Sequence, residues 1–179
     1  MKKMLGVGLF SICSILLIGC GNTNKENISK NKTEDVSVSS ELTKSNDESF
    51  ENDTLTTKDG TIKLTNSEIV ADGNSNLFVI TYEYTNLSNQ NEKPYYLFLS
   101  NFELTQENDN AVKTLSPGSY PSEDRFNELI ENSELDVKPN GTVQAIMAYK
   151  LDDLETPIKL QVGNSISKTD LGNKTFNLK

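Results

Sequence analysis

Residues 77–85 constrain the fold more than any other part of the chain, because apolar side chains alternate along almost their whole length. A period of two indicates a β-strand, since successive side chains point to opposite faces of a sheet. Four large residues share one face: Phe78, Ile80, Tyr82 and Tyr84. The other face is apolar only at Leu77 and Val79. We therefore predict a strand whose first half is buried on both faces and whose second half is buried on one.

Short runs of the same kind recur between turn signals from about residue 55 onward. Antiparallel strands separated by regular turns are typical of two packed sheets. The fold class predicted is therefore all-β, an immunoglobulin-like antiparallel β-sandwich of roughly seven or eight strands. The other residues expected in strands are Ile62, Leu64, Ile69, Val70, Leu97, Leu99, Phe102, Leu104, Val112, Leu135, Val137, Val143, Ala145, Met147, Tyr149, Leu151, Ile158, Leu160, Val162, Phe176 and Leu178.

Two segments of the chain have less regular patterns than these strands. Residues 95–106 form one extended run with a break expected at Asn101. Residues 116–132 begin with two prolines and a glycine, which favour a loop, and end with Phe126, Leu129 and Ile130 at helical spacing. A long irregular loop with a short helix is unusual in a small sandwich, so residues 119–132 are a candidate functional segment.

The N-terminus has the layout of a secretory signal peptide. Lys2 and Lys3 precede an apolar run over residues 4–19, and Cys20 follows. The run is shorter than the roughly 20 residues that a spanning helix needs. Removing residues 1–19 takes away two lysines and no acids, so the formal charge changes from −9 to −11. A surface this acidic repels phosphate, and we expect no nucleic-acid partner.

The residues Leu17-Ile18-Gly19-Cys20 resemble the bacterial lipobox. The resemblance implies cleavage before Cys20, a diacylglycerol on its thiol, further acylation by fatty acids such as palmitate, and attachment to the extracellular face of the cell membrane. Two acyl chains hold a protein at a bilayer stably, whereas one does not. In the alternative interpretation, Cys20 merely ends an ordinary signal peptide.

Residues 20–54 are rich in Asn, Lys, Glu, Ser, Thr and Asp, and apolar residues are scattered among them. Such a composition predicts a polar linker without a core of its own. An alternative is that this segment binds a wall polymer or a partner. The domains expected are thus a signal peptide at 1–19, a lipidated cysteine with its linker at 20–54, and a β-sandwich at 55–179.

Composition also excludes several kinds of catalysis. The chain has no histidine, Cys13 would leave with the signal peptide, and Cys20 would carry lipid. Ser-His-Asp and Cys-His mechanisms are therefore excluded, the usual zinc and copper ligands are missing, and we expect neither a disulfide nor a cofactor. Ser165 and Lys168 have the Ser-x-x-Lys spacing of penicillin-binding enzymes, but a solvated turn explains them better.

Paired acids leave two further possibilities open. The pairs are Asp152 with Asp153, Glu123 with Asp124, and Glu107 with Asp109. Glycoside hydrolysis needs two carboxylates across a cleft, which neighbours in sequence do not establish. Residues 107–110 carry oxygen ligands suited to calcium but lack EF-hand spacing, so a hairpin tip is the preferred interpretation and no metal site is predicted.

Tyr95 and Tyr96 follow Pro94 at a loop end and are the candidate partner-binding residues. Tyrosine combines a large contact area with a polar tip, which suits recognition. Packing of at least one of the two in the core is the alternative. Together these observations predict a non-catalytic surface module that binds a protein or a cell-envelope component. An enzyme that acts on cell-wall material with carboxylates, or a purely structural envelope component, remains as an alternative.

Three segments resemble the telokin-like, immunoglobulin-type domain of lipoproteins from Gram-positive bacteria. They are Tyr82-Glu83-Tyr84-Thr85-Asn86-Leu87-Ser88, Val137-Lys138-Pro139-Asn140-Gly141-Thr142-Val143 and Ala148-Tyr149-Lys150-Leu151. The likeness covers residues 55–179 and implies a β-sandwich displayed outside the cell; it carries over no catalytic residue. Asn86 and Ser88 can also bond nearby backbone where the strand ends, and Pro139 and Gly141 suit a tight turn.

Overall fold

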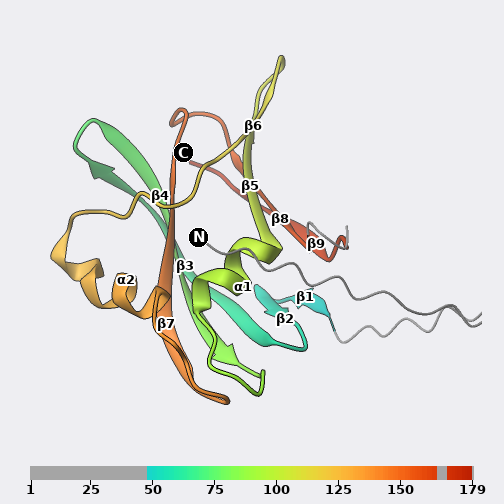
Figure 1. Ribbon diagram of the computed structural model, residues 1–179. Coiled ribbons are helices and arrows are strands. Elements are labelled where there is room, and N and C mark those ends of the chain that lie inside the picture. Colours follow the sequence, from blue (N-terminus) through green and yellow to red (C-terminus); the bar gives the residue numbers. More distant parts are fainter. Residues whose placement is uncertain (1–47, 165–168, 179) are drawn as a thin grey trace, which may run out of the picture. The chain divides into compact units, whose positions relative to one another are not determined.

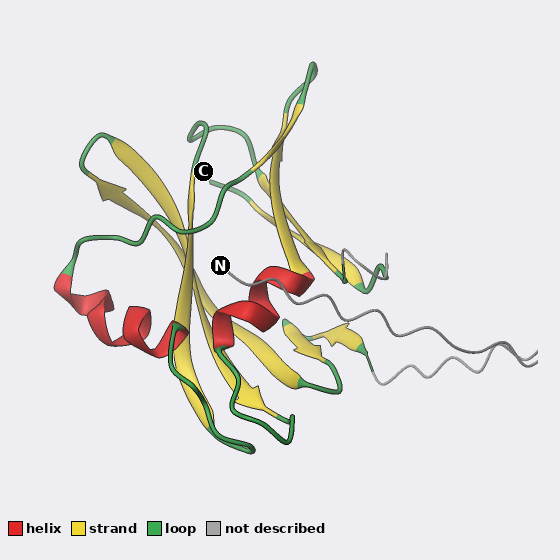
Figure 2. Cartoon of the chain, viewed as in Figure 1, coloured by secondary structure: helices red, strands yellow, loops and turns green. Residues whose placement is uncertain are grey.

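The computed structural model describes residues 48–164 and 169–178, which form a sandwich of two antiparallel sheets (Figure 1). The first sheet has the order β1-β2-β3-β4-β7, and the second has the order β6-β5-β8-β9. The predicted all-β sandwich is confirmed, with nine strands in the described part of the chain. Two short helices and a 3-10 turn complete it (Figure 2).

The elements have the following bounds. The first sheet contains β1 (Ser49–Glu51), β2 (Thr54–Thr56), β3 (Gly60–Asp72), β4 (Ser75–Asn86) and β7 (Thr142–Lys150). The second contains β5 (Phe102–Glu107), β6 (Val112–Thr114), β8 (Ile158–Val162) and β9 (Gly172–Phe176). The helical elements are α1 (Pro94–Asn101), the 3-10 turn η1 (Asp124–Phe126) and α2 (Asn127–Ser133).

Strand β4 has the predicted burial on both of its faces. Phe78, Ile80, Tyr82 and Tyr84 belong to the main core, together with residues of the second sheet such as Leu104 and Leu160. Leu77 and Val79 belong to a second cluster, which Phe126 of η1 completes from the opposite face of the sheet. The first half of β4 is therefore buried on both faces, because the η1–α2 segment packs against the outer face of the sheet.

The predicted helix near residues 123–131 is confirmed as η1 and α2, and this segment protects an edge of the sheet. The Ser133 hydroxyl donates to the Ile146 carbonyl of β7 at 2.8 Å and accepts the Ile146 N–H at 3.1 Å. The Gly118 N–H donates to the Ala148 carbonyl at 3.2 Å. An uncovered edge strand invites pairing with another chain, so the length of residues 116–132 has a structural explanation.

Two strand predictions were wrong. Residues 94–101 form α1 rather than the start of an extended run, and the strand β5 begins only at Phe102. Leu135 and Val137 form no strand: Val137 makes a single antiparallel bridge with Glu92, and Leu135 is exposed.

The first sheet differs from the expectation at two other places. The expected strand residues Ile62, Leu64, Ile69 and Val70 all belong to one long strand, β3, which has a register shift between Leu64 and Asn66. Strand β1 and the first residue of β2 lie within the segment assigned to the linker. Phe50 and Leu55 pair across these two strands and pack on the core. The sheet thus begins at Ser49. No helix within the described ranges is long and apolar enough to cross a membrane.

Candidate functional site

Helix α1 crosses from the end of β4 to the start of β5, and its sequence explains why it is helical (Figure 1). Pro94 occupies its first turn, where a missing N–H costs nothing. Pro94, Phe98 and Asn101 are buried at helical spacing. The Asn101 side-chain amide donates to the Leu97 carbonyl at 2.9 Å, which satisfies a carbonyl in the last turn.

The outward side of α1 is apolar, and it carries Tyr96, one of the two predicted partner-binding residues. Tyr96 is 57% exposed and Leu99 is 41% exposed. Residues three apart are neighbours on a helix, so the two side chains lie on one side of α1. Tyr95 is half-buried against the core, with its ring centroid 4.1 Å from that of Tyr96. We call Tyr96 and Leu99 the α1 surface.

A depression of about 430 Å³ lies beside the α1 surface, and we call it the Tyr84 pocket. Its walls come from four separate segments: the β2–β3 turn, the end of β4, the loop before α1, and α1 itself. The residues that line it are Asp59, Tyr84, Glu92, Lys93, Tyr96, Leu97 and Ser100.

Buried Asn86 fixes the loop that forms one wall of this pocket. Its side-chain amide donates to the carbonyls of Gln90 at 2.7 Å and Val137 at 2.8 Å. Its side-chain oxygen accepts the Ser88 N–H at 2.9 Å. Glu92 is then held against Val137 by two backbone hydrogen bonds of 3.0 Å. The local role expected for Asn86 is thus confirmed, and it extends to the segment around Val137.

The opposite wall is held by the turn before β3. The Thr57 hydroxyl accepts the N–H groups of Asp59 and Gly60 at 3.2 and 3.1 Å, which closes the turn. The Asp59 carbonyl accepts the N–H groups of Leu87 and Ser88 at 3.0 and 3.2 Å. This turn and the loop after β4 are therefore tied together, and Asp59 and Glu92 line the same pocket as Tyr84.

The electrostatics of the pocket are dominated by two carboxylates. Within the described residues, the side chains of Asp59, Glu92 and Tyr84 make no hydrogen bond or ion pair. Burial, with Glu92 and Asp59 adding to it, raises the pKa of Tyr84 to about 12. The phenol therefore keeps its proton at neutral pH.

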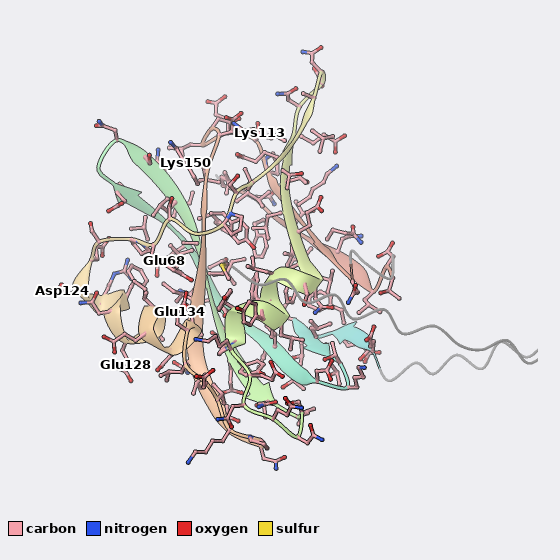
Figure 3. All side chains as sticks on the ribbon, in the orientation of Figure 1. Glu68, Lys113, Asp124, Glu128, Glu134 and Lys150 are labelled. Carbon is pink, nitrogen blue, oxygen red and sulfur yellow. The ribbon has the colours of Figure 1, made fainter. Side chains whose placement is uncertain are left out.

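Lys93 is the only cation among the described residues that line the pocket, and its ammonium has a partner elsewhere. The Lys93 ammonium donates to the backbone carbonyl of Glu134 at 2.7 Å. Glu134, labelled in Figure 3, directly follows α2. Lys93 thus links the loop before α1 to the end of α2, and it forms no ion pair with either carboxylate.

A second cavity, of about 170 Å³, lies beside the C-terminal half of α1. Leu99, Phe102, Leu115 and Tyr149 are among its lining residues, so it is mostly apolar. Ser100 lines both cavities, which places the α1 surface between them.

The acid pairs singled out from the sequence are not brought together around a common cavity. Asp152 forms an ion pair with Lys113, Glu107 with Lys159, and Glu123 with Arg125. The Asn108 side chain accepts the N–H groups of Asn110 and Ala111 at 3.0 Å, as expected of a hairpin tip. Among residues 48–164 and 169–178, no three His, Cys, Asp or Glu side chains are grouped so that they could hold a metal ion.

Two sets of predicted residues lie outside the described part of the chain. They are the lipobox with its lipidation site, Leu17, Ile18, Gly19 and Cys20, and the Ser-x-x-Lys segment of Ser165 and Lys168. Their predictions stand as expectations.

The sequence did not identify Asp59, Glu92 or Tyr84 as residues that line a pocket. Tyr84 was expected on the buried face of its strand, and it does belong to the core. The available signal was the Thr-Asn-x-Ser end of β4, since Asn86 joins the loop to the segment around Val137.

Two solved structures resemble the fold. One is a candidate lipoprotein from Staphylococcus aureus subsp. aureus NCTC 8325, with a TM-score of 0.67 and 20% sequence identity; the match covers 74% of this chain and 92% of that one. The other is a protein from Enterococcus faecalis determined by NMR, with a TM-score of 0.60 and 18% identity, covering 73% of this chain and 92% of that one. At these identities the likeness shows the fold alone.

A search of curated proteins found no match. The model of a protein family does match residues 35–164, a range that includes every element described above except β9. That family is defined by a domain of unknown function, DUF5067. The chain therefore belongs to the DUF5067 family.

Proposed function

We propose that the chain is the precursor of a lipoprotein, cleaved before Cys20 and held by lipid on that cysteine at the extracellular face of the cell membrane. The lipobox Leu17-Ile18-Gly19-Cys20 carries this proposal. The likeness to a candidate lipoprotein from Staphylococcus aureus supports it. Two acyl chains bury enough methylene groups, at about 0.8 kcal/mol each, to hold the protein at the membrane without a spanning helix.

Feeding cells a labelled fatty acid tests this anchor. We expect label on the wild-type chain and none on Cys20→Ser, because the serine hydroxyl cannot form the thioether. The unprocessed serine variant should also keep residues 1–19 and migrate as a larger species. A Cys13→Ser chain is the matched control and should be labelled like the wild type. Label on Cys20→Ser equal to that on the wild type would overturn the proposal.

We further propose that the sandwich is a non-catalytic, immunoglobulin-like binding module that contacts a protein or another envelope component through the α1 surface. The observation that carries this is the pair of exposed apolar side chains, Tyr96 and Leu99, on a helix with a cavity on either side. Tyrosine is enriched at the centres of interfaces, since it combines apolar area with a polar tip. The absence of histidine and the surface ion pairs of the candidate acids favour binding over catalysis.

Recovery of partners from solubilised envelope tests the binding surface. The full chain in detergent serves as bait and is compared with a Tyr96→Ala, Leu99→Ala variant, whose contact area is reduced at α1. We expect at least one partner to fall about tenfold or more in recovery, because truncating a central aromatic contact costs on the order of 2 kcal/mol. Val112→Ala is the control, since Val112 is 62% exposed on β6, away from α1. Equal recovery of every component by all three baits would refute the α1 surface as the site.

A further inference from the structure

The Tyr84 pocket combines three features that favour a positively charged ligand. Two carboxylates, Asp59 and Glu92, line the pocket with the phenol of Tyr84, and neither forms an ion pair among the described residues. Tyr84 lines the pocket although it is only 1% exposed, and its hydroxyl has no hydrogen-bond partner among the described residues. Tyr96 also lines the pocket and is 57% exposed, so its ring can contact a cation.

From these contacts we infer that the Tyr84 pocket binds the ammonium of a lysine or the guanidinium of an arginine presented by a partner protein. The inference rests on the proposed function, because the α1 surface would supply the rest of the contact. A cationic N–H group donates to the Asp59 and Glu92 carboxylates and to the Tyr84 hydroxyl oxygen. The Tyr96 ring covers the methylene groups or the charge itself.

A divalent metal fits the same pocket poorly. Calcium takes six to eight oxygen ligands, whereas the pocket offers two carboxylates that come from separate segments. Magnesium demands near-octahedral geometry, which this arrangement of one phenol and two acids does not provide. An organic cation needs only acceptors and an aromatic face, and both are present.

Charge complementarity also favours a basic partner at longer range. The chain carries a formal charge of −9, and the exposed acids Asp124, Glu128 and Glu134 lie along the η1–α2 segment (Figure 3). Lys93 contacts the end of that segment, so the pocket and the acidic helix are adjacent. Such a field attracts cationic partners and raises their association rate, and salt weakens it.

Peptide titration followed by NMR tests the inference. The purified full chain in detergent is titrated with three capped pentapeptides, Ala-Ala-Xaa-Ala-Ala, in which Xaa is lysine, arginine or norleucine. We expect saturable shifts of the Asp59, Tyr84, Glu92 and Tyr96 amides with the two cationic peptides. Norleucine keeps the apolar chain without the charge and should give no such shifts. Raising the salt from 50 to 500 mM should weaken the binding.

Charge-matched variants identify the groups responsible. Asp59→Asn with Glu92→Gln should raise the Kd for the lysine peptide about tenfold or more, because both ionic acceptors are lost. Glu128→Gln with Glu131→Gln removes the same charge from α2, outside the pocket, and should raise the Kd by no more than about twofold, because it weakens only the long-range field. Dispersed NMR spectra confirm that both variants fold. Equal Kd values for the two double variants, or equal shifts with norleucine, would overturn the inference.

The envelope experiment separates this inference from the function on which it rests. If a partner is lost with the Tyr96→Ala, Leu99→Ala bait but retained by the Asp59→Asn, Glu92→Gln bait, the binding surface stands and the cation pocket is refuted. If that partner is lost with both baits and is retained by the Glu128→Gln, Glu131→Gln bait, both are supported. Retention by every bait refutes the proposed surface itself.

Discussion

Replacing Phe98 with alanine is expected to lower the free energy of unfolding by about 3–5 kcal/mol. Phe98 is 0% exposed, and its ring centroid lies 4.8 Å from that of Tyr82 and 4.5 Å from that of Phe102. Tyr82 belongs to the first sheet and Phe102 to the second. The substitution thus removes the ring that links α1 to both sheets, and it leaves a cavity that the rigid strands cannot close.

Leu99→Ala is the matched control because it removes a similar apolar side chain from the next position of α1. Leu99 is 41% exposed, so this change should cost less than about 1 kcal/mol. Urea unfolding followed by far-ultraviolet circular dichroism gives both values. Similar losses for the two variants would mean that the Phe98 ring does not occupy the position between the sheets.

The strands could be predicted from the sequence where every second side chain of a strand is buried between the two sheets. In β4 and β7 every second side chain points between the sheets. The core residues therefore recur with a period of two, as Phe78, Ile80 and Tyr82 in β4 and as Ala145, Met147 and Tyr149 in β7. The additional burial of Leu77 and Val79 follows from the same reasoning, because the helical spacing of Phe126, Leu129 and Ile130 supplied a covering element.

Helix α1 could not be predicted from apolar content, because aromatic and aliphatic residues suit a buried strand as well as a short helix. Residues 95–99 are a continuous run of aromatic and aliphatic residues, and a strand buried on both faces has the same pattern. The helix is decided by what is buried: Pro94, Phe98 and Asn101 face the core, and Pro94 stands where a helix begins. A proline followed by apolar residues at i+4 was the signal.

The candidate site could be predicted only in its exposed part. Tyr96 was identified because a tyrosine pair beside a proline is conspicuous in one segment. Asp59, Tyr84 and Glu92 lie in three segments, and nothing in their spacing reveals that they meet. Their meeting depends on hydrogen bonds between distant backbone groups, such as that of Leu87 with Asp59 and that of Glu92 with Val137. Sequence periodicity carries no information on such contacts.

Asn86→Ala is expected to lower the free energy of unfolding by about 2–4 kcal/mol, an unusually large loss for a polar residue. Asn86 is 0% exposed, and its side chain satisfies the Gln90 and Val137 carbonyls and the Ser88 N–H. Alanine removes three side-chain hydrogen bonds from this buried position, while the Val137 carbonyl keeps the Glu92 N–H, the Ser88 N–H keeps the Asp59 carbonyl and the Gln90 carbonyl keeps the Ser88 hydroxyl. Each lost hydrogen bond costs about 0.5–1.5 kcal/mol net, so the loss of three accounts for the expected destabilisation.

The same substitution should also disturb the pocket, which distinguishes this role from a general loss of stability. Glu92 is positioned by its two backbone bonds to Val137, and Asn86 holds the Val137 carbonyl from the other side. Amide hydrogen exchange at Glu92 and Val137 should therefore speed up in Asn86→Ala even under conditions in which the sheets stay folded. Asn89→Ala is the control, because Asn89 is exposed in the same loop, and it should change neither stability nor exchange. If Asn86→Ala increased the exchange rates of the Glu92 and Val137 amides only as much as those of the buried β4 amides, Asn86 would stabilise the whole domain and would not specifically shape the pocket.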